Sequence, residues 1–271
     1  MHDHSKYPLI DIGVNLTNNS FKDDFSEVID RAFEAGVQRM IITGTDADSS
    51  EQAQRLAKDY PDELFSTAGI HPHDAKTLSN NTLDTIAGLT ELNEVVAVGE
   101  TGLDFNRNYS SPEDQIKSFE KHIELAIEKD LPLFLHERDA FTKQWEMLKH
   151  YRDQISEAVI HCFTGTKKQA FSYLDLDLHI GITGWICDER RGSHLHEFVS
   201  DIPINRLLIE TDAPYLIPRV KPAPKLKSKR RNEPCTLPLV LKTISEHHEL
   251  SAEAIAAHTT DNAIRLFRLS K

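Results

Sequence analysis

Titratable side chains recur where short apolar runs end in this 271-residue sequence. The run PLFLHERDAF, residues 132–141, passes from apolar residues directly into His136. Similar runs deliver Glu100 in VVAVGE, His161 in VIHCF and Asp212 in LLIETD. Imidazoles and carboxylates that converge on one point bind divalent cations, which activate water for hydrolysis. Any one of these groups alone would be an ordinary polar strand end, but the four together predict a hydrolytic metal site.

The apolar runs are typical of strands covered on both faces, because nearly every position in them is apolar. Amphipathic stretches typical of helices lie between them, such as residues 23–36, which end at Gly36, and residues 111–130, which begin with Ser111 as N-cap and Pro112. The strand candidates are residues 8–14, 39–43, 64–69, 95–100, 131–136, 158–163, 178–183 and 206–210.

Eight strand–helix units predict an α/β fold, a single (β/α)8 TIM-type barrel that spans residues 1–271. A doubly wound open sheet is the alternative, disfavoured because no glycine-rich phosphate loop follows the first strand. In a barrel the carboxyl ends of all strands meet at one face, and catalytic groups lie there. The loop GIHPHD after the third strand adds His71 and His73 to that face.

The composition is that of a globular protein, with 39% hydrophobic and 27% charged residues. A net charge of −12 argues against a protein that coats nucleic acid non-specifically. Three widely spaced cysteines argue against a disulfide framework and fit a reducing cytosol. No membrane span or secretory signal is visible, so a cytoplasmic protein is expected. Cys162, next to His161, is expected to be a small core residue rather than a nucleophile.

A basic stretch, RVKPAPKLKSKRRNEP at residues 219–234, follows the last predicted strand. It holds seven Lys and Arg residues in an otherwise acidic chain. Such a stretch is either a solvated loop or a track for backbone phosphates, and a position beside the catalytic face favours the second interpretation. Trp185, in GITGWICDERRG, is either a stacking platform for a base or a packed loop aromatic.

Several motifs give the chain a close resemblance to the TatD-type metal-dependent DNases, which belong to the amidohydrolase-like barrels. The matching motifs are DIGVNL (11–16), ITGT (42–45), STAGIHPHDA (66–75), VGETGLDFNRN (98–108), FLHERDA (134–140), HCFTGT (161–166), GITGWICDERRG (181–192), LLIETDAPYL (207–216) and RRNEP (230–234). The resemblance implies a (β/α)8 barrel that hydrolyses phosphodiester bonds of nucleic acid. It implies a 3′→5′ exonuclease that prefers single-stranded DNA, extends to RNA, and takes part in DNA repair or degradation.

The resemblance also implies roles for individual residues. Glu100, His136, His161 and Asp212 match the family's metal ligands, and Glu100 and Asp212 its catalytic carboxylates. The residues expected to bind substrate are Asn15, His71, His73 and Arg231. Mg²⁺ is the expected metal, and the ligand types also admit Mn²⁺ or Zn²⁺. We expect a monomer, because no dimerisation stripe stands out.

One departure from the family pattern concerns the first strand, where most relatives carry D-x-H-x-H. This chain keeps Asp11 but has Gly13 and Asn15 at the two histidine positions, as one branch of the family does. We therefore expect one firmly held metal in the substrate-free protein, with any second ion recruited chiefly by substrate phosphate. Gly13→His with Asn15→His should raise the stoichiometry towards two, provided the strand tolerates a side chain at position 13. Two other function classes stay open: hydrolysis of an amide or aminoacyl ester on the same barrel, and a non-catalytic binding barrel.

Overall fold

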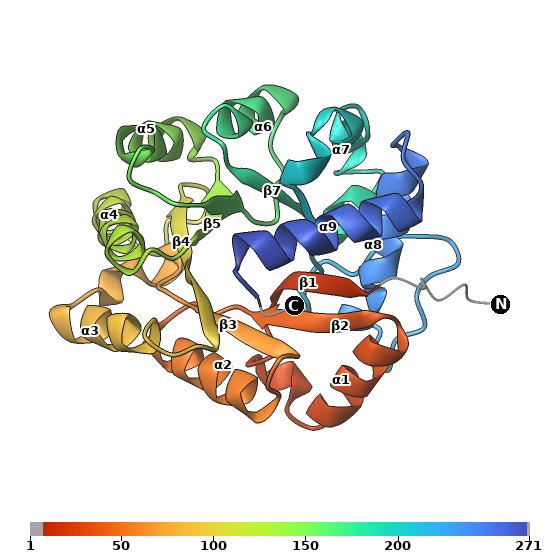
Figure 1. Cartoon of the computed structure of the whole chain (residues 1–271), viewed down its shortest axis with the longest axis horizontal. Coiled ribbons are helices and arrows are strands. Elements are labelled where there is room, and N and C mark those ends of the chain that lie inside the picture. Colours follow the sequence, from red (N-terminus) through yellow and green to blue (C-terminus); the bar gives the residue numbers. More distant parts are fainter. Residues whose placement is uncertain (1–7, 270–271) are drawn as a thin grey trace.

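Eight parallel strands follow one another in a single sheet in the order of the sequence (Figure 1). The computed structural model describes residues 8–269. The strands are β1 (Leu9–Val14), β2 (Val37–Ile42), β3 (Leu64–Ala68), β4 (Val95–Asp104), β5 (Leu133–Arg138), β6 (Ala158–Ile160), β7 (His179–Ile182) and β8 (Leu207–Ile209). Backbone hydrogen bonds from Asp212 to Gly13 and from Asn15 to Ala213, 2.9 and 2.7 Å long, join β8 to β1 at their carboxyl ends. The predicted barrel is confirmed.

Helices alternate with the strands and surround them. They are α1 (Phe25–Glu34), α2 (Ala47–Asp59), α3 (Asn80–Leu89), α4 (Pro112–Lys129), α5 (Phe141–Tyr151), α6 (Lys167–Leu174), α7 (Ser193–His196), α8 (Leu237–Glu246) and α9 (Ala252–Leu266). Short 3-10 turns are η1 (Asn19–Phe21), η2 (Pro72–Thr77), η3 (Gly184–Cys187), η4 (Val199–Asp201), η5 (Ile204–Arg206) and η6 (Pro234–Thr236). Two predicted helix signals are confirmed: the Ser111 side chain caps α4 by accepting from the Asp114 amide, and Gly36 follows α1 at a φ of 90°.

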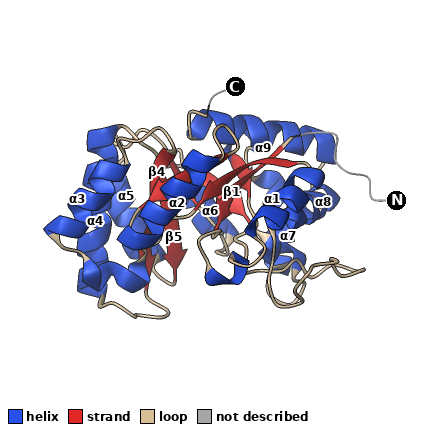
Figure 2. Ribbon diagram, turned by 90° about the horizontal axis from the view of Figure 1, so that it is seen from below, coloured by secondary structure: helices blue, strands red, loops and turns tan. Residues whose placement is uncertain are grey.

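The core has two parts, which explains why the strands are apolar on both faces. One part packs the outer faces of the strands against the surrounding helices. The other fills the barrel interior with residues such as Ile10, Ile41 and Phe134. Leu266 and Phe267, at the end of α9, belong to this inner cluster, so α9 closes the amino-terminal end of the barrel (Figures 1 and 2).

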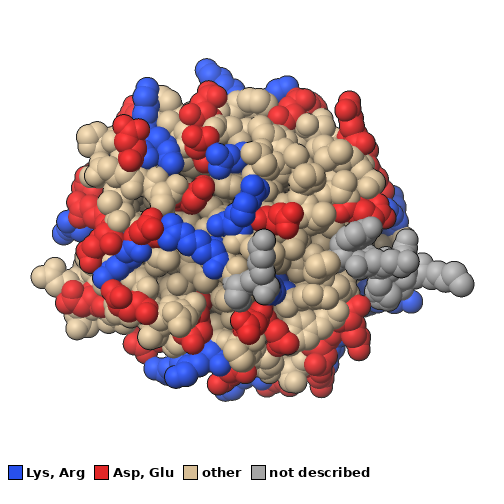
Figure 3. Space-filling view, viewed as in Figure 1, with Lys and Arg blue, Asp and Glu red and all other residues tan. Residues whose placement is uncertain are grey.

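The face of the molecule on which α9 lies carries basic and acidic side chains side by side, with no extended area of one charge sign (Figure 3). Such a surface offers no continuous track for a polyanion. Among residues 8–269, no helix combines the length and the apolar character that crossing a bilayer requires.

A β-bulge in β4 turns Glu100 into the barrel mouth. Between the pairs Val98–Leu133 and Thr101–Leu135, β4 advances by one residue more than β5. An extra residue in one strand re-aims the side chains beside it. Gly99, at φ 145°, makes the bulge possible, because a Cβ there would overlap the Phe134 carbonyl oxygen. The sequence had suggested that Glu100 is the last residue of its strand. In the structure Glu100 lies within β4, which continues to Asp104.

Candidate active site

A cavity of about 580 Å³ opens at the carboxyl end of the barrel. Seven of the eight residues predicted for the site line it, and they come from six different strand ends. They are Asn15, His71, His73, Glu100, His136, His161 and Asp212. The structure therefore brings seven of the predicted side chains together in one cavity, and their roles stay predictions.

The Glu100 carboxylate is the centre of the cluster and is only 6% exposed. Its Oε1 lies 2.8 Å from His161 Nε2, 3.0 Å from His136 Nδ1 and 3.4 Å from His71 Nε2. Burial opposes ionisation of Glu100, but His161 and the other imidazoles hold its pKa well below the usual range. One anionic oxygen therefore faces three imidazole nitrogens.

The far nitrogens of two of these imidazoles face carboxylates. His161 Nδ1 lies 3.2 Å from Glu210 Oε2, and His136 Nε2 lies 3.4 Å from Asp104 Oδ2. The second contact lacks good hydrogen-bond geometry, and His136 Nε2 is buried with no other partner. Carboxylates can only accept, and both nitrogens of each ring face one, so each ring can donate to Glu100 as well as to its far carboxylate. Loss of the proton on the near nitrogen would free a lone pair that points at Glu100, as metal ligation requires.

The neutral ring of His71 is the tautomer that carries its proton on Nε2. It caps η2, and its Nδ1 accepts a 3.0 Å hydrogen bond from the His73 backbone N–H. Its Nε2 must then carry the proton that points toward Glu100. Burial lowers the pKa of His71, which keeps the ring neutral. Ligand atoms of His71, Glu100 and His136 lie within 4.8 Å of one another, but the ring orientation makes His71 a hydrogen-bond donor.

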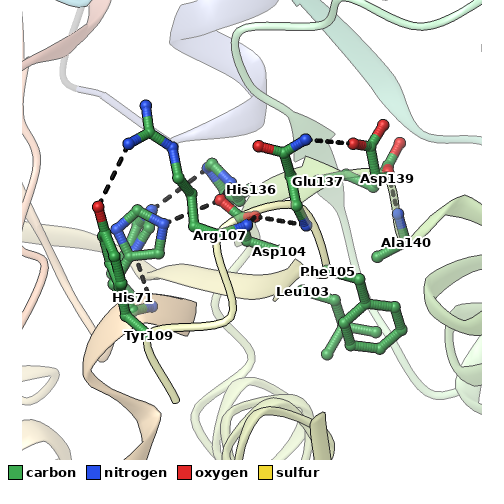
Figure 4. A network of polar contacts seen from close by, with 12 residues as sticks. His71, Leu103, Asp104, Phe105, Arg107, Tyr109, His136, Glu137, Asp139 and Ala140 are labelled. Carbon is green, nitrogen blue, oxygen red and sulfur yellow. Dashed lines mark hydrogen bonds and ion pairs between the residues drawn. The ribbon is translucent and has the colours of Figure 1, made fainter. Parts of the chain in front are cut away.

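A second layer of contacts surrounds Asp104 at the end of β4 (Figure 4). Its Oδ2 lies 2.9 Å from His73 Nε2, and its Oδ1 accepts from the Arg107 backbone N–H over 2.8 Å. The Arg107 guanidinium in turn donates to Tyr109 Oη over 3.2 Å. Asp104 lies in the motif VGETGLDFNRN, and the sequence gave it no role. It ties His73, His136 and the loop after β4 together.

Asp212 follows β8 on the β1 side of the cavity, where the Asn15 amide donates to its Oδ1 over 2.9 Å. Burial raises the pKa of Asp212 to about 7, and the negative charges of Glu100 and Glu210 add to that effect. A carboxylate with such a pKa exchanges protons with water near neutral pH, which suits a general base.

Arg231 does not reach the cavity, which corrects the expectation that it contacts substrate. Its guanidinium is buried and donates to Asp24 over 2.6 and 2.8 Å and to Glu233 over 2.7 Å. Arg31 pairs with the same two acids. Arg231 is therefore part of an internal ion cluster between α1 and the loop before η6.

The basic stretch 219–234 contributes no Lys or Arg to the cavity wall, and Lys227 instead contacts Glu27 and Asp24 at 2.6 and 3.3 Å. The arginines that line the cavity are Arg107, Arg138 and Arg191. The guanidinium carbons of Arg138 and Arg191 lie 5.9 and 4.3 Å from the centre of the Trp185 ring. No sequence signal separated these arginines from other surface cations.

Cys162 was expected in the core, but it is half-buried and lines the cavity. Strand β6 ends at Ile160, so the alternation of a strand no longer decides where Cys162 points. Its φ of 47° turns the chain there. Burial raises the pKa of the Cys162 thiol well above its usual value, and the nearby carboxylates of Asp212 and Glu210 add to this. The thiol is therefore a poor nucleophile.

Comparison with known proteins agrees with this geometry. The profile of the family described as TatD related DNase matches residues 10–268. The chain is 48% identical over 263 residues to the "3'-5' ssDNA/RNA exonuclease TatD" of Citrobacter rodentium, covering 97% of this chain and 98% of that protein. It is 50% identical over 262 residues to the protein of the same name from Erwinia tasmaniensis, and the match covers 96% of this chain and 100% of that protein.

The fold matches the solved structure of YJJV, a TatD homologue from Escherichia coli, with a TM-score of 0.86 and 28% identity. The alignment covers 97% of this chain and 98% of that one. A (β/α)8 barrel with a carboxylate–imidazole cluster at the carboxyl ends of its strands places the chain in the class of barrel enzymes. Within that class, the chain belongs to the TatD-related DNase family, as its motifs suggested, and is a nuclease.

Proposed function

We propose that this protein is a metal-dependent 3′→5′ exonuclease that acts on single-stranded DNA and also on RNA. The observation that carries the proposal is the convergence of His136 Nδ1 and His161 Nε2 on one oxygen of Glu100. The names of the TatD relatives support the polarity and the substrate.

Glu100, His136 and His161 would hold the metal, with Asp212 across the cavity as a further ligand. Two imidazole lone pairs and a carboxylate oxygen fit a divalent cation, with Mg²⁺ proposed and Mn²⁺ or Zn²⁺ compatible with the ligand types. When bound there, such a cation polarises the phosphate and makes water easier to deprotonate.

The chain's own residues supply the remaining functions. Asp212 accepts a proton from the water whose oxygen attacks phosphorus, and the leaving oxygen takes up a proton from solvent as its bond to phosphorus breaks. The His71 Nε2–H donates to a phosphate oxygen, and Asp104 keeps His73 beside it. Asn15 keeps the Asp212 carboxylate in place. Because Glu100 and His161 are almost completely buried, an unpaired strand end can enter the cavity more easily than a duplex.

We also propose that the chain acts as one domain and as a cytoplasmic monomer with a role in DNA repair or degradation. Free Cys162, Cys187 and Cys235 support a reducing compartment.

The test uses 5′-labelled and 3′-labelled oligonucleotides, single- and double-stranded, with Mg²⁺, Mn²⁺ or a chelator, beside a panel of aminoacyl esters and amides. We expect stepwise shortening from the 3′ end that stops with the chelator. His136→Ala should lose orders of magnitude in rate and keep its fold, whereas His258→Ala, on the exposed face of α9, should behave as the unmodified protein. Full activity in the chelator, or turnover of the esters or amides alone, would reject the proposal.

A further inference from the structure

A second cavity of about 870 Å³ adjoins the active-site cavity, and we call it the side groove. The two cavities have five wall residues in common, so they share one boundary at the mouth of the barrel. The shared residues are Glu137, Arg138, Thr164, Trp185 and Arg191. The reaction outlined above takes place in the first cavity and gives the side groove no function.

The segments that follow β5, β6 and β7 build the side groove. Its wall includes Thr142 and Glu146 of α5, Thr166 and Gln169 at the start of α6, and His194 of α7. These three helices follow one another around one side of the barrel (Figure 1). The side groove therefore leads from the barrel mouth toward α5 and α6, away from the catalytic cluster.

Trp185 lies at the boundary between the two cavities, and its neighbours hold it in place. Its Nε1 donates to the backbone oxygen of Arg191 over 3.2 Å, and the Arg191 guanidinium carbon lies 4.3 Å from the ring centre. The Nε of Arg191 donates to the buried Asp188 carboxylate over 3.2 Å. The Arg191 side chain is nevertheless 53% exposed. An indole ring beside an accessible guanidinium offers a stacking surface for a base and a partner for a phosphate.

The charges of the side groove suit a nucleotide chain better than a simple anion. Three basic side chains and three carboxylates line it, namely Arg138, Lys143, Arg191, Glu137, Asp139 and Glu146. The carboxylates would repel a ligand that carries negative charge alone. A nucleotide chain offers phosphates to the basic groups and the amino groups of its bases to the carboxylates. Phe105 and Phe141 add apolar surface for the bases.

We propose that the side groove holds the part of the nucleic acid strand on the 5′ side of the bond being cut. The strand leaves the active-site cavity over Trp185, where one base stacks, and continues toward α5 and α6. This inference rests on the proposed function for the direction of the strand. Binding in the side groove is separate from cleavage and can be measured without it.

The first experiment follows tryptophan fluorescence while a single-stranded octanucleotide is added to the protein in chelator. The chain has two tryptophans, so each signal can be assigned by removing the other. Trp145 is the matched control, because it is half-buried, donates to the Ser172 carbonyl and lines neither cavity. We expect the octanucleotide to quench the emission in the unmodified protein and in Trp145→Phe, but not in Trp185→Phe.

The same titration gives the contribution of the stacked base to affinity. Trp185→Ala should bind the octanucleotide roughly 10-fold more weakly, the effect of one lost stacking contact, and Trp145→Phe should bind it as the unmodified protein does. Absence of quenching in the unmodified protein, or equal affinity in Trp185→Ala, would overturn the proposal.

The second experiment maps the path on the unmodified protein and so does not depend on whether a variant folds. A photoreactive 4-thiothymidine is placed at successive positions from the 3′ end, and the crosslinked peptides are identified by mass spectrometry. We expect positions upstream of the 3′-terminal nucleotide to mark Trp185 first, and then α5 or α6. Upstream crosslinks to residues 219–234 or to η1 instead would reject the side groove as the path.

The two proposals fail in different ways. A strand that occupies the side groove but is not shortened when Mg²⁺ or Mn²⁺ is restored would reject the proposed function and leave the groove standing. Shortening from the 3′ end with upstream crosslinks elsewhere would reject the groove and leave the proposed function standing.

Discussion

The Asn15 side-chain amide donates a 2.9 Å hydrogen bond to Asp212 Oδ1 and so joins the carboxyl ends of β1 and β8. The D-x-H-x-H pattern, from which this chain departs, would place an imidazole where this chain has the amide. The amide cannot become a cation, but its N–H stabilises the ionised form of the carboxylate. Position 15 therefore supplies a hydrogen-bond donor that lowers the pKa of Asp212, the proposed base, in place of a metal ligand.

This hydrogen bond predicts a shift in the pH dependence of the reaction. A base must be ionised, so the rate should rise with pH through the pKa of Asp212, which burial raises to about 7 in the metal-free protein. Asn15→Ala removes a contact that lowers this pKa, so the rising limb should move to higher pH by roughly one unit. The measurement is a pH–rate profile at saturating Mn²⁺, with exposed Asn19→Ala as control. An identical limb in Asn15→Ala would show that the amide does not act on Asp212.

Metal binding should weaken as the pH falls. Burial opposes protonation of His161, but Glu100 and Glu210 raise its pKa well above the usual value; Asp104 and Glu100 likewise raise that of His136 against burial. A protonated imidazole cannot ligate a metal, so Mn²⁺ affinity should begin to fall at a pH above 6.5, the ordinary histidine pKa. Calorimetric titration of the stripped protein should give one tight site per chain. Constant affinity between pH 8 and 6, or two equal tight sites, would contradict this.

The path of the nucleic acid depends on which of two sets of basic side chains contacts its phosphates. Arg107, Arg138 and Arg191 line the cavity, whereas Lys225, Lys229 and Arg230 belong to the loop outside it. If the first set contacts phosphates, its triple Gln variant should reduce the slope of log affinity against log salt by about 2. The matched loop variant should leave the slope unchanged. Binding is measured with a single-stranded oligonucleotide in chelator, and the reverse result would restore the loop as the phosphate track.

The ion cluster around Arg231 should matter for stability rather than for substrate binding. Arg231→Met leaves Asp24 and Glu233 buried with only Arg31 and Lys227 nearby, so we expect a loss of about 3 kcal/mol in the free energy of unfolding. Exposed Arg230→Met should change it by less than about 0.5 kcal/mol. Denaturant unfolding measures both variants, and weaker oligonucleotide binding with unchanged stability in Arg231→Met would contradict this assignment.

The stabilisation that the ion cluster around Arg231 gives to the fold depends on pH. The hydrogen bonds from Arg231 hold the pKa of Asp24 well below its usual value despite its burial. The stabilisation is complete above the ordinary aspartate pKa, near 3.9, and is lost as the pH falls below it. The difference in stability between Arg231→Met and the unmodified protein should therefore shrink in strong acid.

Local sequence patterns predicted most of this architecture, because strands buried on both faces are continuous apolar runs. They also predicted the strand ends at which Glu100, His136, His161 and Asp212 emerge. The bulge in β4 was not predictable, since it depends on the register against β5. The position of Arg231 was not predictable either, because its partner Asp24 is 207 residues away in the chain. The direction of each imidazole depends on the contact of its second nitrogen, which only the folded chain supplies.

The closure of the barrel by α9 has a consequence for how the proposed exonuclease would work. Because Leu266 and Phe267 fill the amino-terminal end, the strand enters and the product leaves at the carboxyl end of the barrel. Each excised nucleotide must leave past the strand from which it was cut, while that strand advances in the opposite direction. Release of the mononucleotide and entry of the next nucleotide of the strand then take place at the same end of the barrel. Accumulated mononucleotide should therefore slow degradation by occupying the cavity.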